Sequence, residues 1–145
     1  MITVLAVRHA DITDPEAGGD PSLSAAGRRR AAALAHVVRD LVIDTVVVST
    51  LRRTRETVAQ VLDERPGLEL LVEDRPADRA DALRRGELGA TVLVAGHSNT
   101  VPELVVALFG DPVTPILATE FDRLLVLTVA DSTAVVRGLR YGAAG

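Results

Sequence analysis

Cysteine and lysine are both absent from this chain of 145 residues, and aromatic residues make up 2% of it. Without cysteine, disulfides and thiolate metal sites are excluded and a redox role is disfavoured. Only metal sites made of His, Asp and Glu remain open. All sixteen basic residues are Arg, so a buried anion would be bound by planar guanidinium groups rather than by ammonium groups.

Long apolar runs and a basic surface are missing as well. No apolar run approaches the ~20 residues that span a bilayer, and no basic N-terminal region precedes a long apolar segment. A net charge of -4 and few aromatic rings disfavour nucleic-acid binding. We therefore expect a soluble cytoplasmic protein with neither nucleic acid nor membrane among its partners. The length and the 48% hydrophobic content fit a single domain over residues 1–145.

The chain alternates buried strands with amphipathic helices. Short apolar runs predict strands at 2–7, 44–49, 68–72 and 91–95. Helical spacing of apolar residues predicts helices at 24–41, 50–64 and 101–109, with a short helix within 78–85. The last two apolar runs predict a hairpin of strands at 123–129 and 133–139. This order predicts an α/β fold: a three-layer sandwich with a mainly parallel central sheet, helices on both faces and a C-terminal β-hairpin.

The segments around the first helix carry local expectations. Residues 11–22 include Asp14, Pro15 and two consecutive glycines, a composition typical of a loop. Ser24 is the expected N-cap of the helix. We assign the Arg residues of this helix to its solvent-facing sides and His36 to a structural or partly exposed position. The tail at 142–145 is expected to fray.

Chemically reactive side chains follow three of the four predicted parallel strands. Arg8 and His9 follow the first strand, and His97 follows the fourth in a Gly-His-Ser-Asn-Thr turn. The second strand ends at Ser49, and Arg52, Arg53 and Arg55 come after it. The carboxyl ends of parallel strands meet at one edge of a sheet, where ligands bind in open α/β folds. We therefore expect these side chains to converge in space.

Such a set of residues suits phosphoryl transfer. Two Arg forks would hold the oxygens of a phosphate and offset its charge. Helix N-termini after the second and fourth strands would add backbone donors. One imidazole would act as the nucleophile and form a covalent intermediate, so the site requires neither a metal ion nor another cofactor.

Four motifs follow one another along the chain. They are Val7-Arg8-His9-Ala10, Leu23-Ser24 with Gly27, Ser49-Thr50-Leu51-Arg52-Arg53-Thr54 with Thr57, and Gly96-His97-Ser98. In this order they resemble the histidine phosphatase superfamily, also called the phosphoglycerate-mutase-like family, and the small size resembles its compact branch of bacterial phosphohistidine phosphatases. The resemblance implies a metal-independent phosphatase that hydrolyses a phosphomonoester or a protein phosphohistidine through a phosphohistidine enzyme intermediate.

The resemblance also implies roles for individual residues. His9 would be the nucleophile that becomes phosphorylated, and His97 the second catalytic histidine of the pocket. Arg8 and Arg53 would bind the phosphate, and Ser98 would add a hydroxyl or backbone donor. The other arginines of the second helix start, at 52 and 55, do not match the pattern and are assigned to solvent.

One departure concerns the proton donor to the leaving group. The acid-phosphatase branch of the family places an Asp directly after its second His, whereas Ser98 occupies that place here. We look for the donor after the third predicted strand, with Asp74 as the first candidate, Glu73 as the second and Asp78 as the third. The alternative is that all three belong to a solvated acidic loop. Asp11 is expected either to orient a pocket group or to pair with an Arg at the rim.

Three other functions remain open. A non-catalytic phosphate-recognition module would keep the pocket and lack turnover. A phosphoglycerate-mutase-type phosphotransferase is disfavoured because the segment between the third and fourth strands is short for a lid. A hydrolase with His9, His97 and Asp11 as metal ligands is disfavoured because metal sites rarely place two Arg cations against the ion.

Overall fold

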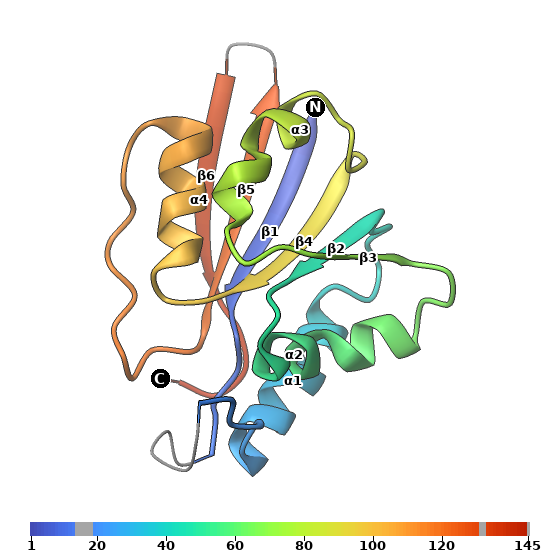
Figure 1. Ribbon diagram of the computed structural model, residues 1–145, viewed down its shortest axis with the longest axis vertical. Coiled ribbons are helices and arrows are strands. Elements are labelled where there is room, and N and C mark those ends of the chain that lie inside the picture. Colours follow the sequence, from blue (N-terminus) through green and yellow to red (C-terminus); the bar gives the residue numbers. More distant parts are fainter. Residues whose placement is uncertain (14–18, 131–132, 145) are drawn as a thin grey trace.

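The computed structural model describes residues 1–13, 19–130 and 133–144. Within these residues the chain forms one mixed sheet with the strand order β3-β2-β4-β1-β5-β6 (Figure 1). Four strands run parallel: β1 (Ile2–Arg8), β2 (Thr45–Val48), β3 (Glu69–Val72) and β4 (Thr91–Gly96). An antiparallel hairpin continues the sheet beside β1 and consists of β5 (Arg123–Ala130) and β6 (Thr133–Arg140). The predicted sheet with its C-terminal hairpin is confirmed.

Helices cover both faces of the sheet (Figure 1). One face is covered by α1 (Ala25–Val37) and α2 (Arg52–Asp63). The other face is covered by the 3-10 helix η1 (Pro76–Arg79), α3 (Ala80–Arg84) and α4 (Thr100–Phe109). Alternate side chains of β1 belong to the two apolar layers: Leu5 and Val7 to the first, Val4 and Ala6 to the second. The central strands are thus buried on both faces, which explains their continuous apolar runs.

Helix α1 begins where the sequence predicts and ends earlier. Ser24 Oγ accepts a hydrogen bond from the backbone N–H of Gly27 at 3.1 Å, as expected of the N-cap. At the other end, Arg65 Nη2 donates to the carbonyl oxygens of Val38 (2.6 Å) and Leu41 (3.2 Å). The expectation of a helix to residue 41 is wrong, because a distant side chain satisfies carbonyls that the helix end leaves free.

Arg30 is buried, which contradicts its assignment to a solvent-facing side. Its Nε lies 2.7 Å from Asp11 Oδ1, and its Nη1 donates to the carbonyl oxygens of Tyr141 (3.0 Å) and Ala143 (2.8 Å). A buried guanidinium is tolerated because it is paired and hydrogen-bonded. These contacts hold the C-terminal tail against the segment after β1, so the expectation of fraying is wrong over residues 142–143.

Other local expectations have mixed outcomes. His36 is exposed, and the guanidinium of Arg39 lies 3.2 Å from its Nδ1. The predicted loop at 11–22 is described in part: Ile12 pairs with Leu23 in an isolated antiparallel bridge. Asp14 and Pro15 lie outside the described residues, as does the hairpin turn at 131–132.

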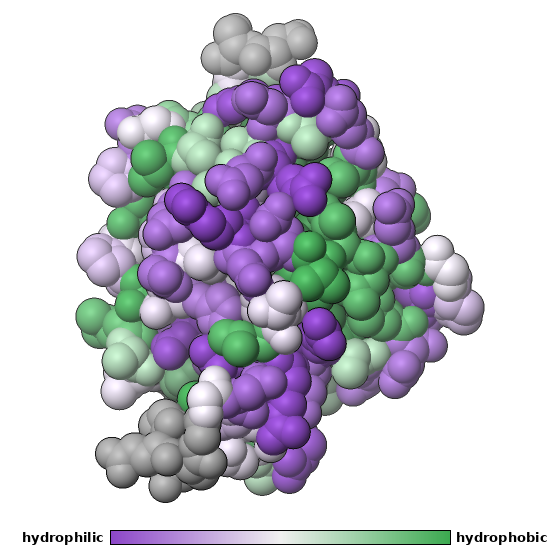
Figure 2. Space-filling model, in the orientation of Figure 1, coloured by the Kyte–Doolittle hydropathy of each residue, from purple (hydrophilic) through white to green (hydrophobic). Residues whose placement is uncertain are grey.

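The β3 edge of the sheet carries exposed apolar side chains. Leu70 and Val72 of this edge strand are 43% and 42% exposed. Figure 2 shows a hydrophobic patch on the side of the molecule where β2 and β3 lie, whereas hydrophilic residues cover the side of α3. Among the described residues, no helix is long and apolar enough to cross a membrane.

Candidate active site

His9 lies just beyond the end of β1 and is buried, with 4% of its surface exposed. Its backbone N–H donates to the carbonyl oxygen of Gly96 at the end of the neighbouring strand β4 (2.8 Å). Its Nδ1 lies 2.8 Å from the carbonyl oxygen of Ala10. A carbonyl oxygen only accepts hydrogen bonds, so Nδ1 carries the ring proton and Nε2 carries the lone pair. The backbone therefore selects the tautomer in which Nε2 is the nucleophilic atom.

The charge state of His9 suits the same role. The pKa of His9 is lowered to about 4, chiefly by burial and in addition by the positive charge of Arg8 and Arg53. The hydrogen bond to the Ala10 carbonyl acts in the opposite direction. The ring is therefore neutral near neutral pH, as a nucleophile must be.

Arg8 is half-buried beside His9 and is held by the segment that precedes β5. Its Nη1 donates to the carbonyl oxygens of Leu117, Ala118 and Glu120 at 3.0 to 3.1 Å. Its guanidinium carbon lies 4.0 Å from the ring centroid of Phe121. Its Nε is buried and has no hydrogen-bond partner within residues 1–13, 19–130 and 133–144.

Arg53 lies in the first turn of α2, lines the same cavity and is half-buried. Its buried Nε likewise has no partner in the described part of the chain. Thr57 joins this helix to the segment of His9: its Oγ1 accepts from the Ala10 N–H (2.8 Å) and donates to the Arg53 carbonyl (2.7 Å). Two arginine Nε–H donors are therefore available for an anion in one cavity.

His97 follows β4, and its ring centroid lies 5.4 Å from that of His9. Its Nε2 lies 2.9 Å from Ser49 Oγ, which in turn lies 3.1 Å from Thr54 Oγ1. Burial is the largest cause that lowers the pKa of His97, and the charges of Arg53 and Arg8 act in the same direction. A second neutral imidazole therefore stands beside the first, held by hydroxyl groups.

The turn that carries His97 depends on a glycine. The backbone N–H of His97 donates to Thr100 Oγ1 at 2.9 Å, at the start of α4. A Cβ at Gly96 would lie 2.8 Å from that same oxygen. The close approach of strand end and helix start thus requires glycine at position 96.

A cavity of about 560 Å³ lies at this edge of the sheet. Every residue of the predicted site lines it. The lining residues are Arg8, His9, Ile12, Thr50, Leu51, Arg53, Asp74, His97, Ser98, Asn99 and Thr100. The arginines at 52 and 55 are exposed and are not among them. The convergence expected of parallel strand ends is what the structure shows.

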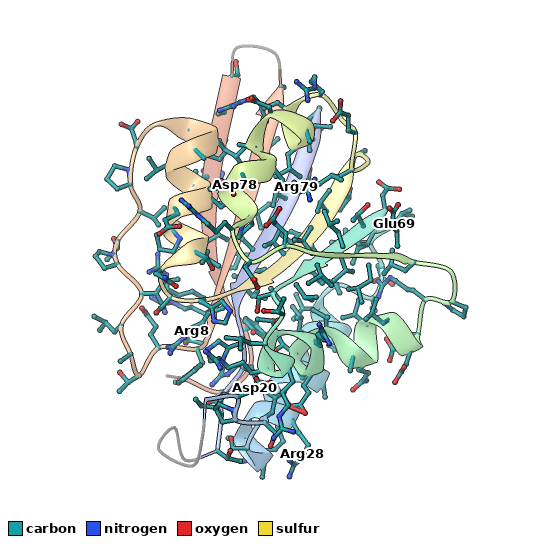
Figure 3. All side chains as sticks on the ribbon, viewed as in Figure 1. Arg8, Asp20, Arg28, Glu69, Asp78 and Arg79 are labelled. Atoms are coloured by element: carbon teal, nitrogen blue, oxygen red, sulfur yellow. The ribbon has the colours of Figure 1, made fainter. Side chains whose placement is uncertain are left out.

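Among the three carboxylates considered as proton donors, Asp74 alone lines the cavity. Its Oδ1 accepts hydrogen bonds from the backbone N–H (2.8 Å) and the hydroxyl (2.9 Å) of Thr50. These two bonds lower the pKa of Asp74, because they stabilise the ionised carboxylate. Glu73 pairs with Arg79 at 2.8 Å instead. Asp78 lies near Arg79, well away from Arg8 (Figure 3).

The carboxylate of Asp11 binds a basic side chain. It pairs with Arg30, so the expected pair with an Arg forms, but this Arg is buried and is not at the rim of the cavity. Within residues 1–13, 19–130 and 133–144, no group of three or more His, Asp or Glu side chains is arranged to hold a metal ion. The arrangement of His9, His97 and Asp11 therefore does not match the metal-ligand set of the alternative hydrolase.

Sequence reasoning missed contacts that hold the site together. Phe121 and the three carbonyl groups that hold Arg8 come from a segment with no regular pattern. Ser49 lies in one of the motifs but had no predicted partner, and its contact with His97 spans 48 residues of sequence. Only the approach of parallel strand ends pointed to that contact.

Comparisons with known proteins support the same architecture. The family model of the histidine phosphatase superfamily (branch 1) matches residues 4–80. The structure resembles that of the protein histidine phosphatase SixA complexed with tungstate, with a TM-score of 0.78, 22% identity, and 96% of this chain and 97% of that chain covered.

Two further structures share the fold. The alpha-ribazole phosphatase from Shigella flexneri has a TM-score of 0.78 at 16% identity, with 99% of this chain and 98% of that chain covered. A mycobacterial glucosyl-3-phosphoglycerate phosphatase has a TM-score of 0.71 at 17% identity, with 100% of both chains covered. The sequence has no significant match among curated proteins. Because the family model matches more than half of the chain, the protein belongs to the histidine phosphatase superfamily, branch 1.

Proposed function

We propose that this protein is a metal-independent phosphatase that forms a phosphohistidine intermediate on His9. One observation carries the proposal: the Ala10 carbonyl holds the proton on Nδ1 of a buried, neutral imidazole, which leaves the Nε2 lone pair for attack. Among the described residues, the Nε–H groups of Arg8 and Arg53 have no hydrogen-bond partner, which supports phosphate as the group that is attacked.

In the first step, Nε2 of His9 attacks the phosphorus, and the bond to the leaving group breaks. The leaving group keeps the bonding electrons. A positive charge forms on the imidazole, and the hydrogen bond from Nδ1–H to the Ala10 carbonyl stabilises it. Arg8 and Arg53 bind the non-bridging oxygens as charge moves through the transition state. In the second step, water attacks the phosphorus, the P–N bond breaks, and His97 takes the proton of the water.

The surroundings of Asp74 favour one substrate class. Its carboxylate, the first candidate for the proton donor, is stabilised in its ionised form by Thr50, and an ionised carboxylate is a poor acid. A sugar alkoxide needs a proton to leave, whereas the imidazole of a phosphohistidine needs less assistance. We therefore favour protein phosphohistidine over alkyl phosphomonoesters. The fold shared with a protein histidine phosphatase supports this choice.

The same property of Asp74 supports a second candidate. A phosphate-recognition module without turnover would keep both arginines and would need no acid at all. Steady-state assays with p-nitrophenyl phosphate separate the two functions, because this leaving group departs without protonation. Binding of phosphate without any turnover would support the recognition module.

Trapping of the intermediate tests the proposal. Rapid acid-free quenching during turnover of a ³²P-labelled phosphohistidine protein should leave label on His9, in a bond that is labile to acid and stable to base. His9→Ala should carry no label and have no activity. His36→Ala is the matched control, because His36 is exposed on α1 and should behave as the wild type does. Label on a Ser or Asp side chain, or full activity of His9→Ala, would contradict the proposal.

A further inference from the structure

The segment 117–121 precedes β5 and lies outside the region matched by the family model. Its backbone carbonyls at Leu117, Ala118 and Glu120 all accept hydrogen bonds from one atom, Arg8 Nη1. Nη1 carries two hydrogens, so three acceptors fully occupy it. This end of the guanidinium is therefore committed to the protein. We name the segment 117–121 the Arg8 cradle.

Phe121, the last residue of the Arg8 cradle, completes the contact. Its ring centroid lies 4.0 Å from the guanidinium carbon of Arg8, a distance at which the ring face attracts the cation. The same ring lies 6.0 Å from that of His9, with an angle of 58° between the planes. One aromatic side chain thus packs on the candidate phosphate-binding arginine and lies near the ring of the candidate nucleophile.

The cradle determines which edge of Arg8 remains for a ligand. Nη1 is occupied, whereas Nε is buried and has no hydrogen-bond partner in the described part of the chain. The edge formed by Nε and Nη2 is one of the planar forks that bind two oxygens of a phosphate together. With Nη1 held by carbonyls and the plane held by the Phe121 ring, this fork has one orientation.

The cradle is itself braced by the hairpin. Glu120 Oε1 accepts from the backbone N–H of Leu117 at 3.2 Å, and its Oε2 binds Arg140 Nη1 on β6 at 2.7 Å. Arg140 also binds Asp122 Oδ1 at 2.8 Å. Strand β6, although distant in sequence from the site, therefore supports the position of Arg8.

We propose that the Arg8 cradle, with Phe121 as its positioning residue, orients the Nε–Nη2 edge of Arg8 toward the transferred phosphoryl group. This inference rests on the proposed function, because that function supplies the phosphoryl group. Phe121 acts through Arg8 and does not itself contact the reacting atoms.

Substitution at Phe121 tests the cradle. Phe121→Leu keeps an apolar side chain and removes the ring, whereas Phe121→Tyr keeps the ring face. We expect Phe121→Leu to lower kcat/KM for p-nitrophenyl phosphate and the affinity for tungstate by roughly three- to thirty-fold. Phe121→Tyr should restore both. Phe109→Leu is the matched control: Phe109 is the other phenylalanine, at the end of α4, and its loss should lower stability without changing kcat/KM or tungstate binding.

A spectroscopic readout identifies the cause. In protein with ¹⁵N-labelled arginine, the buried Arg8 Nε–H signal, assigned by its loss in Arg8→Lys, should exchange slowly with solvent and shift when tungstate is added. Phe121→Leu should make this exchange faster at unchanged global stability. Unchanged exchange and unchanged tungstate affinity in Phe121→Leu would overturn the inference.

The test distinguishes failure of the cradle from failure of the proposed function. If the wild-type protein binds tungstate and does not hydrolyse p-nitrophenyl phosphate, the proposed phosphatase function is contradicted. The tungstate-binding and exchange measurements on Phe121→Leu then still test the cradle. Wild-type protein that does not bind tungstate would overturn the cradle as well, because no oxyanion would then meet Arg8.

Discussion

The two histidines of the cavity follow adjacent parallel strands, yet different groups hold their rings. A backbone carbonyl binds His9, whereas the hydroxyl of Ser49 binds His97. A carbonyl only accepts, so it imposes one tautomer, whereas a hydroxyl accepts or donates and permits both. The difference suits His9 to present a lone pair and His97 to exchange protons.

The segments that carry the two rings are also held by different contacts. The His9 segment is tied to α2 by Thr57, through its backbone at Ala10, and to α1 by the pair of Asp11 with buried Arg30. The carbonyl of Asp11 also packs so closely on α1 that a Cβ at Gly27 would lie 1.9 Å from it. The His97 segment is tied instead to α4, through the hydrogen bond of its backbone N–H to Thr100 Oγ1. The His9 segment is thus held by two helices that precede β3, whereas the His97 segment is held by the helix that follows it.

The largest expected effect is a loss of stability in acid. It tests whether the two histidines differ, because we expect most of the loss to come from His9. The pKa of His9 is about 4 in the folded protein, below its ordinary value of 6.5, so the unfolded chain binds the proton first as the pH falls. The free energy of unfolding should therefore decrease between pH 6.5 and pH 4 by up to about 3 kcal/mol. Denaturant unfolding across this range measures the decrease. His9→Gln should reduce it more than His97→Gln, and an equal decrease in wild type and His9→Gln would contradict the burial of a neutral ring.

Arg53 should have the next largest effect, because its charge lowers the pKa of both histidines. Arg53→Lys keeps the charge and loses the planar fork, so we expect a loss close to that of Arg53→Ala. Each should lower kcat/KM for p-nitrophenyl phosphate by roughly ten- to a hundred-fold, or about 1.5–3 kcal/mol. Arg55→Lys, on the exposed side of the same helix, is the control. Wild-type turnover of Arg53→Lys would place Arg53 outside the site.

The smallest effect is expected for substitutions at Asp74. A large effect there would contradict the comparison of the two histidines, because protons would then be exchanged by Asp74 as well as by His97. Asp74→Asn keeps an oxygen that accepts from Thr50, whereas Asp74→Ala removes it. We expect Asp74→Asn to remain close to wild type and Asp74→Ala to lose roughly five-fold in kcat/KM. Kinetics with alkyl phosphates and with p-nitrophenyl phosphate measure both. If Asp74 is instead the proton donor, both variants should lose ~10²–10⁴-fold on the alkyl phosphates alone.

The sequence predicted the fold and the identity of the lining residues for a common physical reason. Parallel strands buried on both faces are continuous apolar runs, and the residues that follow them lie at one edge of the sheet. Local patterns therefore predicted that Arg8, His9 and His97 lie together. The family resemblance was needed to choose Arg53 over its neighbours at 52 and 55. Reasoning from local patterns failed for Arg30, since a helical position does not show which partners a long charged side chain will reach.

Amino-acid sequence by itself determined the strand and helix order, the α/β class and the pair of histidines and arginines at one sheet edge. These follow from apolar periodicity and from the residues at strand ends, which are local properties. Tertiary structure alone decided the tautomer of His9, the partners of Asp74 and Asp11, and the contacts of Arg8 with the segment 117–121. Each of these depends either on a contact between segments distant in the chain or on the direction of a backbone carbonyl group. Neither kind of interaction produces a periodic signal in the sequence.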